Sequence, residues 1–340
     1  MSAIFVSKEV FWLTLNTILT EAVKVGASDI HLTVGQRTFF RVSGEFLKFG
    51  ELLTKEEVEK FLVELVPPRL VDELKNNLSV DFSYVEKNIQ RRFRVNVYYQ
   101  RNLPAVAFRL ISNKIPTLEE IGAPSALKKF LNSAQGLILV TGRTGSGKST
   151  TLASFLQQLC NVRLCHLLTL EDPIEFEYDA PNSFISQREL GQDFLKFADA
   201  VRTALREMPD VLLIGEIRDA ETMHAALEAS AAGILVLATL HTKSAAETAM
   251  RVETMFPLVQ RDSIRDLFAD EFSAIISQQL LSTSDGGRVC AAEVLLANPA
   301  TRSLIRQGKY VQLPTVMMSH QSQGMQTMEG AVKILRSKLL

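Results

Sequence analysis

The stretch between Leu137 and Leu156 constrains the fold of this chain more than any other part of the sequence. An apolar run that ends at Thr141 leads directly into Gly142–Ser149, which matches the pattern G-x-x-x-x-G-K-[ST], and a helix-compatible run follows. This order is typical of a phosphate-binding loop, because the glycines let the backbone wrap around phosphate groups and the helix N-terminus stabilises their charge. Chance produces the pattern in on the order of one such chain in a hundred. The sequence therefore predicts a phosphate-binding loop within an α/β domain.

The individual residues of this loop predict how a nucleotide is held. Lys148 is placed to reach the β and γ phosphate oxygens, and the hydroxyl of Ser149 is suited to coordinate Mg²⁺. We therefore expect ATP and Mg²⁺ as the ligands of the chain. The expected nucleotide-binding residues are Gly142, Thr144, Gly145, Ser146, Gly147, Lys148, Ser149 and Thr150.

Three further apolar runs, 167–170, 211–214 and 234–240, are separated by segments of helical character. Such runs are typical of parallel strands that crossover helices bury on both faces, and ligands bind at the carboxyl ends of such strands. Carboxylates follow two of the runs, three within 171–175 and one at Glu216, which stands in the usual place of the Walker B aspartate. Alone, an acidic turn is more often a helix cap or a solvated loop. Beside a phosphate-binding loop, we expect one site to orient or activate the attacking water and the other to hold the metal.

A histidine follows the third run. His241, within Thr239–Thr242, gives the apolar strand a polar tip that is suited to sensing the γ-phosphate or the water. A single histidine is more often structural, so both interpretations stay open at this point.

The length of 340 residues and the apolar fraction of 46% predict two folded domains. We expect an α+β domain over residues 1–112, a polar linker at 113–117, and an α/β domain over 118–340 that becomes helical from about 260.

The first domain has its own pattern. It predicts a helix near 9–25, a strand near 38–48, and a helix over 54–66 that the following prolines end. A later segment alternates polar and apolar residues, so that Arg92 and Arg94 share one face of a strand whose other face is apolar.

The charged residues nearly cancel, with 37 Lys and Arg against 38 Asp and Glu and a net charge of −1. No large basic field is available to a nucleic-acid backbone or an anionic membrane, so no direct nucleic-acid binding is expected. The three cysteines are too few and too scattered for a disulfide framework or a zinc site. The longest apolar run, Ala229–Leu240, is about half of the ~20 residues that a membrane span needs. We therefore expect a soluble, cytoplasmic protein.

Taken together, these motifs resemble those of the PilT branch of the type II/type IV secretion ATPases, over nearly the whole chain. Extension and export members of that family usually carry a four-cysteine zinc insert, for which this chain lacks the cysteines. The matching stretches are Gly26–His31, Gly142–Ser149, Glu171–Glu175, Gln187–Glu189, Arg206–Asp210, Gly215–Asp219, Thr239–Thr242 and Ala300–Gln307.

The resemblance implies a PAS-like N-terminal domain, a RecA-like P-loop ATPase domain with a helical C-terminal region, and a homo-hexameric ring. It implies that Glu175 is the general base, that Glu216 serves the magnesium site, and that arginines of the first domain reach the nucleotide of the neighbouring subunit. Such arginines contribute roughly 10³–10⁵ in rate. Without the resemblance, a solvated strand face is the simpler interpretation of these arginines. The predicted catalytic residues are Lys148, Glu175, Glu216, His241, Arg92, Arg94 and Arg109, and the predicted metal ligands are Ser149 and Glu216.

The implied function is a motor that acts on an inner-membrane pilus platform protein and powers pilus retraction, bound peripherally at the cytoplasmic face of a bacterial inner membrane. Two alternatives stay open: an ATPase of a related secretion or DNA-uptake system, and a nucleotide-gated regulatory subunit with weak turnover. Ile234 suggests the second, because many family members have a histidine there. Met208, where an aspartate is common, and Pro104, in a typically glycine-rich turn, are further departures.

Overall fold

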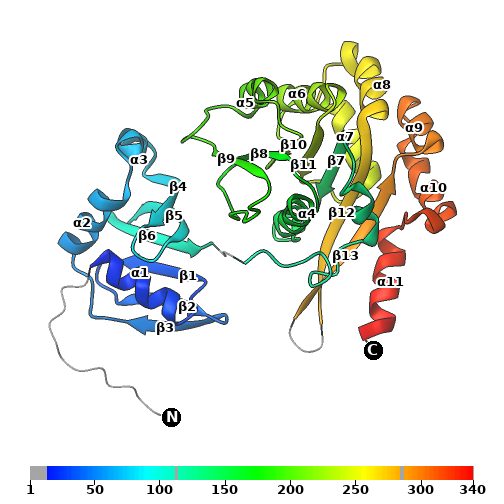
Figure 1. Ribbon diagram of the computed structural model, residues 1–340. Coiled ribbons are helices and arrows are strands. Elements are labelled where there is room, and N and C mark those ends of the chain that lie inside the picture. The colour runs from blue at the N-terminus through cyan, green and yellow to red at the C-terminus, as the bar shows by residue number, and fades with distance from the viewer. Residues whose placement is uncertain (1–13, 112–113, 284–286, 340) are drawn as a thin grey trace. The chain divides into compact units, whose positions relative to one another are not determined.

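The computed structural model describes residues 14–111, 114–283 and 287–339 (Figure 1). The chain divides into two compact units, the first ending at Asn113 and the second starting at Lys114. Each unit has a hydrophobic core of its own. Among the described residues, no helix combines the length and the apolar character that crossing a membrane requires.

The first unit is an antiparallel sheet of six strands in the order β3-β2-β1-β6-β5-β4, with helices packed on one face. Its core joins Ile18 of α1 and Phe61 of α2 to inward side chains of the sheet such as Phe93. The elements are α1 (Leu15–Lys24), β1 (Asp29–Thr33), β2 (Thr38–Val42), β3 (Glu45–Phe49), α2 (Lys55–Leu65), α3 (Val71–Asn77), β4 (Ser79–Glu86), β5 (Arg91–Gln100) and β6 (Leu103–Leu110).

Local sequence explains several of these elements. In β5, Val95 and Val97 are fully buried while Arg92 and Arg94 lie on the opposite face, as the alternation predicts. Helix α2 starts after Thr54, whose side chain forms a capping box with the third helical residue, and the prolines after its last turn cannot continue it.

The structure corrects one prediction for this unit and describes only part of the segment of a second. The single strand expected over 38–48 is wrong, because Ser43 and Gly44 adopt positive φ angles of 50° and 88° and turn the chain between β2 and β3. Of the helix expected near 9–25, α1 covers 15–24, and the residues before position 14 lie outside the described part of the chain.

The second unit contains a seven-stranded sheet in the order β13-β12-β7-β11-β10-β8-β9. All neighbouring strands are parallel except β13, which pairs antiparallel with β12. The strands are β7 (Gly136–Thr141), β8 (His166–Glu171), β9 (Phe184–Glu189), β10 (Val211–Ile214), β11 (Leu235–Leu240), β12 (Phe272–Ser282) and β13 (Arg288–Leu296).

Helices cover both faces of this sheet, with α4 on one side and α5 and α6 on the other (Figure 1). Every residue of β7, β10 and β11 is buried, which explains why these runs are apolar throughout instead of alternating. The helices are α4 (Lys148–Val162), α5 (Phe197–Ala204), α6 (Ala220–Ala231), α7 (Ala245–Thr254), α8 (Arg261–Glu271), α9 (Pro299–Arg306), α10 (Leu313–Ser319) and α11 (Met328–Leu339). Short 3₁₀ turns occur at Pro68–Leu70, Ser125–Phe130, Leu205–Glu207, Leu258–Gln260, Tyr310–Gln312 and Gln321–Gln323.

The expectation that the chain is helical from about 260 onward is wrong for β12 and β13. These strands extend the sheet beyond β7, and Ile275 and Ile276 of β12 are both fully buried. Because β12 is covered on both faces along this stretch, its sequence shows neither strict alternation nor a clear strand signal.

Candidate nucleotide-binding site

The predicted phosphate-binding loop lies where the buried strand β7 meets α4. The strand ends at Thr141 and the helix starts at Lys148. Between them, Gly142, Gly145 and Gly147 have φ angles of 143°, 77° and 89°, which L side chains rarely adopt. The shape of the loop therefore depends on glycine at these positions.

Lys148 is buried and its ammonium group contacts the loop itself. It donates to the carbonyl oxygens of Gly142 at 2.9 Å and Arg143 at 3.2 Å. Burial lowers the pKa of Lys148, and the negative charges of Glu216 and Glu175 oppose that shift. Both predicted carboxylates thus act electrostatically on the lysine of the loop.

The loop offers features that suit a phosphate group. The hydroxyl oxygen of Ser146 is buried, and no described residue forms a hydrogen bond with it. A methyl group at Gly142 would lie 2.4 Å from the carbonyl oxygen of Gln278 and 2.5 Å from Ser146 Oγ, so the backbone can approach this closely only with glycine. Ser149, in the first turn of α4, is exposed. An unpaired buried donor, a lysine and a helix N-terminus form a fitting set of groups for nucleotide phosphates.

Four parallel strands, β7, β11, β10 and β8, are neighbours in that order, so the segments that follow them meet at one edge of the sheet. His241 follows β11, Glu216 follows β10, and Asp172 follows β8. The Nε2 atom of His241 lies 3.1 Å from Oε1 of Glu216. The strand order therefore brings two predicted site residues into direct contact.

Glu216 is also held by a residue that sequence reasoning did not single out. Nη2 of Arg218 donates to Glu216 Oε2 at 2.9 Å and lies 3.7 Å from Oδ2 of Asp172. Burial alone would raise the pKa of Glu216, but the hydrogen bond and charge of Arg218, together with His241, outweigh it and keep the pKa below its ordinary value. An ionised carboxylate is the form that binds Mg²⁺. Arg218 is part of a matching motif, but its contact with Asp172 depends on the pairing of β10 with β8.

The carboxylates of 171–175 separate into different environments. Glu175, the predicted base, is exposed, and its backbone N–H donates to Oε2 of the buried Glu171 at 3.4 Å. Glu171 also accepts from Thr169 Oγ1 at 2.7 Å and Gln187 Nε2 at 3.3 Å. Burial raises the pKa of Glu171 to about 7, although these hydrogen bonds oppose the rise. Glu171 is therefore placed to support the segment, while Glu175 faces solvent.

The predicted arginines belong to the first unit, on the sheet face opposite the core. Arg94 lies directly across from Arg109 in the pairing of β5 with β6, and Arg92 is two residues away on β5. Arg109 donates to Asp29 Oδ1 at 2.9 Å, and Arg94 lies 3.5 Å from Asp81 Oδ2. Both signs of charge thus occur on this face. A role for these arginines at a nucleotide stays a prediction.

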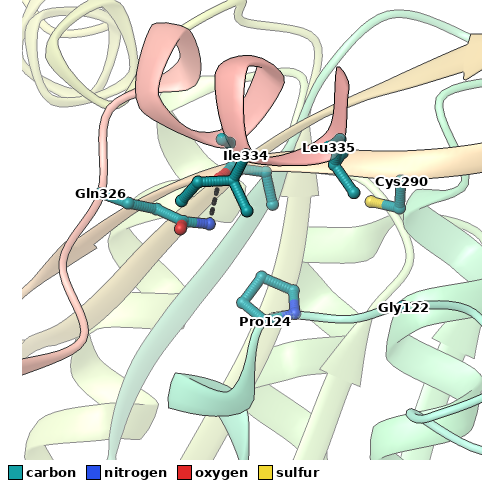
Figure 2. A pocket seen from close by; sticks show the side chains of 8 residues that line it. Gly122, Pro124, Cys290, Gln326, Ile334 and Leu335 are labelled. Atoms are coloured by element: carbon teal, nitrogen blue, oxygen red, sulfur yellow. Dashed lines mark hydrogen bonds between the residues drawn. The ribbon is translucent and has the colours of Figure 1, made fainter. Parts of the chain in front are cut away.

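A hollow of about 100 Å³ lies away from this site, between α11, β13 and the segment at 122–124 (Figure 2). The side chain of Gln326 spans part of it and donates to the carbonyl oxygen of Ala292 at 2.7 Å. No charged side chain is among its lining residues, and none of the predicted site residues lines it, so it lacks groups for phosphate. The lining residues are Gly122, Pro124, Cys290, Ala292, Gln326, Ala331, Ile334 and Leu335.

These features define a P-loop protein of the nucleotide-binding class: a strand, glycine loop and helix in succession, the buried Lys148, and carboxylates after neighbouring strands. Residues 7–290 match the family described as Type II/IV secretion system protein. The chain belongs to this family, and the family resemblance found in the sequence is confirmed.

Relatives of known structure or name support this membership. The chain is 39% identical over 327 residues to the Type IV pilus retractation ATPase PilT of Pseudomonas aeruginosa, covering 96% of this chain and 95% of that protein. The crystal structure of the pilus retraction motor PilT with bound ADP matches with a TM-score of 0.83 at 39% identity, covering 94% and 96% of the two chains. The ATPase DotB of Legionella pneumophila matches with a TM-score of 0.86 at 30% identity, covering 98% and 95%. The α/β fold class predicted from the sequence is confirmed.

Proposed function

We propose that this chain is an ATP-hydrolysing motor that assembles as a homo-hexameric ring and powers the retraction of type IV pili. The observation that carries the proposal is the contact of Glu216 with both His241 and Arg218. The negative charges of Glu216 and Glu175 also act on the pKa of Lys148 in the phosphate-binding loop. Full-length similarity to a pilus retraction ATPase supports the type of work that hydrolysis would drive.

In this proposal each group of the loop has a defined task. Backbone N–H groups and Lys148 bind the phosphates, while Ser149 and Glu216 would hold Mg²⁺, which would supply positive charge against the phosphate oxygens. Glu175 accepts a proton from the attacking water, and His241 orients Glu216 through their contact. When the nucleotide binds, before hydrolysis, Lys148 exchanges its present carbonyl partners for phosphate oxygens.

The remaining features of the proposal concern assembly. The first unit is PAS-like, the second is RecA-like, and Arg92, Arg94 or Arg109 reaches the nucleotide of the neighbouring subunit. The ring acts on an inner-membrane platform protein from the cytoplasm and contacts the membrane only through that partner. The support is the family resemblance together with the shared, partly exposed face on which these arginines lie.

The test is ATP turnover per subunit against protein concentration, with the size of the assembly measured in the same samples. We expect Glu175→Gln to lower turnover about 10²–10⁴-fold, as for loss of a general base, while Glu177→Gln, an exposed carboxylate two residues away, keeps it. At least one of Arg92→Ala, Arg94→Ala and Arg109→Ala should lower it by roughly 10³-fold or more, with the exposed Arg69→Ala as control. Slow turnover that is independent of concentration and of all these substitutions would contradict the motor.

A second candidate function is a motor of a related secretion system, which the match to DotB favours. Crosslinking in cells that identifies the membrane partner separates the two, and normal pilus retraction in a strain without the protein would favour the second. The regulatory-subunit alternative would be excluded by turnover well above background in the purified assembly. Ile234, which motivates it, is buried just before β11, at the amino end of a strand whose carboxyl end leads to His241. At ~3.3 Å per residue the two positions are roughly 20 Å apart.

A further inference from the structure

The segment that joins β8 to β9, residues 172–183, contains the predicted base Glu175 and forms neither helix nor strand in the described chain. Regular backbone hydrogen bonds therefore do not determine its conformation. Side chains from neighbouring elements supply those bonds instead, and two of the donors are glutamines from different elements.

Gln187 of β9 binds the segment just after Glu175. Its Nε2 group donates to the carbonyl oxygen of Phe176 at 2.8 Å, and its Oε1 atom accepts from the backbone N–H of Tyr178 at 3.2 Å. The same Nε2 group donates to Glu171 at 3.3 Å. One side-chain amide thus takes the place of a paired strand for two backbone groups of the segment.

Gln157 of α4 binds the segment one residue further on. Its Nε2 group donates to the carbonyl oxygen of Asp179 at 2.7 Å, and its Oε1 atom accepts from the N–H of the same residue at 3.1 Å. Helix α4 starts at Lys148, so this pair of bonds ties the segment to the helix that continues the phosphate-binding loop.

Two carboxylates bind the segment at Glu175 itself. The N–H of Ile174 donates to Glu189 Oε2 at 3.2 Å, and the N–H of Glu175 donates to Glu171 Oε2 at 3.4 Å. Backbone N–H groups on both sides of the predicted base are therefore satisfied by side chains of β8, β9 and α4, while Glu175 itself is exposed.

We propose that Gln157 and Gln187 are positioning residues that hold Glu175 at a set place relative to the phosphate-binding loop during ATP hydrolysis. The inference rests on the proposed function, because it gives Glu175 the task of activating water. Displacement of a reacting group by about 1 Å costs on the order of 10²-fold in rate, so loss of either amide should lower the catalytic rate without altering how the nucleotide binds.

The test uses the full-length assembled protein and three variants, Gln157→Ala, Gln187→Ala and the exposed control Gln260→Ala. We expect the first two to lower kcat by roughly 10-fold or more and the control to leave it unchanged. The dissociation constant of a fluorescent ADP analogue and the thermal midpoint should stay close to those of the unaltered protein in all three.

The deciding measurement places Gln157→Ala and Gln187→Ala in a Glu175→Gln background. If the glutamines act through Glu175, their substitution lowers kcat no further in the Glu175→Gln background, because the effects of residues that act as a unit are not additive. Equal losses in both backgrounds, or a weakened ADP analogue affinity alongside the loss, would overturn the proposal.

Failure of the proposed base is distinguishable from failure of the positioning residues. If Glu175→Gln keeps full turnover, the assignment of the base is wrong and the positioning role falls with it. If Glu175→Gln lowers turnover while both glutamine variants retain it, only the positioning role is wrong.

Discussion

The glycine at the start of the phosphate-binding loop permits a matched prediction, because a second glycine in the same loop also has a positive φ angle but lacks its close contacts. Both Gly142 and Gly145 have positive φ angles, at 143° and 77°. A Cβ at Gly142 would meet the carbonyl oxygen of Gln278 at 2.4 Å, whereas a Cβ at Gly145 would meet nothing within 4 Å. Gly142→Ala and Gly145→Ala therefore separate backbone strain from steric conflict.

The expected costs follow from these distances. A positive φ angle costs an alanine about 1–2 kcal/mol, which applies to both variants. Gly142→Ala adds an overpacking cost of about 1–3 kcal/mol, because the carbonyl of Gln278 belongs to β12, whose pairing with β7 holds it in place. We expect Gly142→Ala to lower the free energy of unfolding by about 2–5 kcal/mol and Gly145→Ala by about 1–2 kcal/mol.

The assay is denaturant unfolding of the two variants side by side, followed by binding of a fluorescent ADP analogue. At about 2–4 °C per kcal/mol for a unit of this size, Gly142→Ala should also lower the thermal midpoint clearly more than Gly145→Ala. Nucleotide affinity should fall in both, since each alters the loop. Equal destabilisation by the two substitutions would refute the steric argument and the close approach on which it rests.

Three further predictions concern the site and the core. Because the pKa of Glu171 is raised to about 7, the folded chain retains a proton that the unfolded chain releases near its ordinary pKa of 4.5, so this stabilisation is present below about pH 4.5 and is lost as pH rises through 7. At about 1.36 kcal/mol per pKa unit, Glu171→Gln should remove up to about 3 kcal/mol of the pH dependence of the free energy of unfolding. The check is denaturant unfolding from pH 5 to 8, and the same pH dependence in the variant as in the unaltered protein would contradict the prediction. Arg218→Ala removes the partner that keeps the pKa of Glu216 low, so the acid limb of the turnover profile should move to higher pH, and an unchanged limb would count against the contact. Phe155→Ala, at a fully buried position in α4, should cost about 3–5 kcal/mol in denaturant unfolding, against no more than about 0.5 kcal/mol for the exposed Leu164→Ala.

The sequence by itself determined the features that depend on short stretches of chain. A strand, a glycine loop and a helix follow one another directly at Gly142–Ser149, and their order and composition are enough to predict a phosphate-binding loop. The α/β class follows likewise from apolar runs alternating with helical segments. The boundaries of α2 were also readable, because its cap at Thr54 and its stop at Pro67 are local.

Only the tertiary structure decided which of these stretches meet. The order β7-β11-β10-β8 brings His241 to Glu216, and the pairing of β10 with β8 brings Arg218 close to Asp172. Strand order in a parallel sheet depends on how the crossovers pack, and neighbouring residues in the sequence do not encode it.

The same reason explains what the sequence analysis missed. Gln157 lies on the helix before the segment 172–183 and Gln187 on the strand after it, and both bind the segment. The spacing of a glutamine in the sequence does not indicate which backbone groups its amide will bind. The strands β12 and β13 were missed because burial of β12 on both faces removed the period-two signal. Local chemistry was thus readable from the sequence, whereas the contacts that turn it into a site required the packing of distant segments.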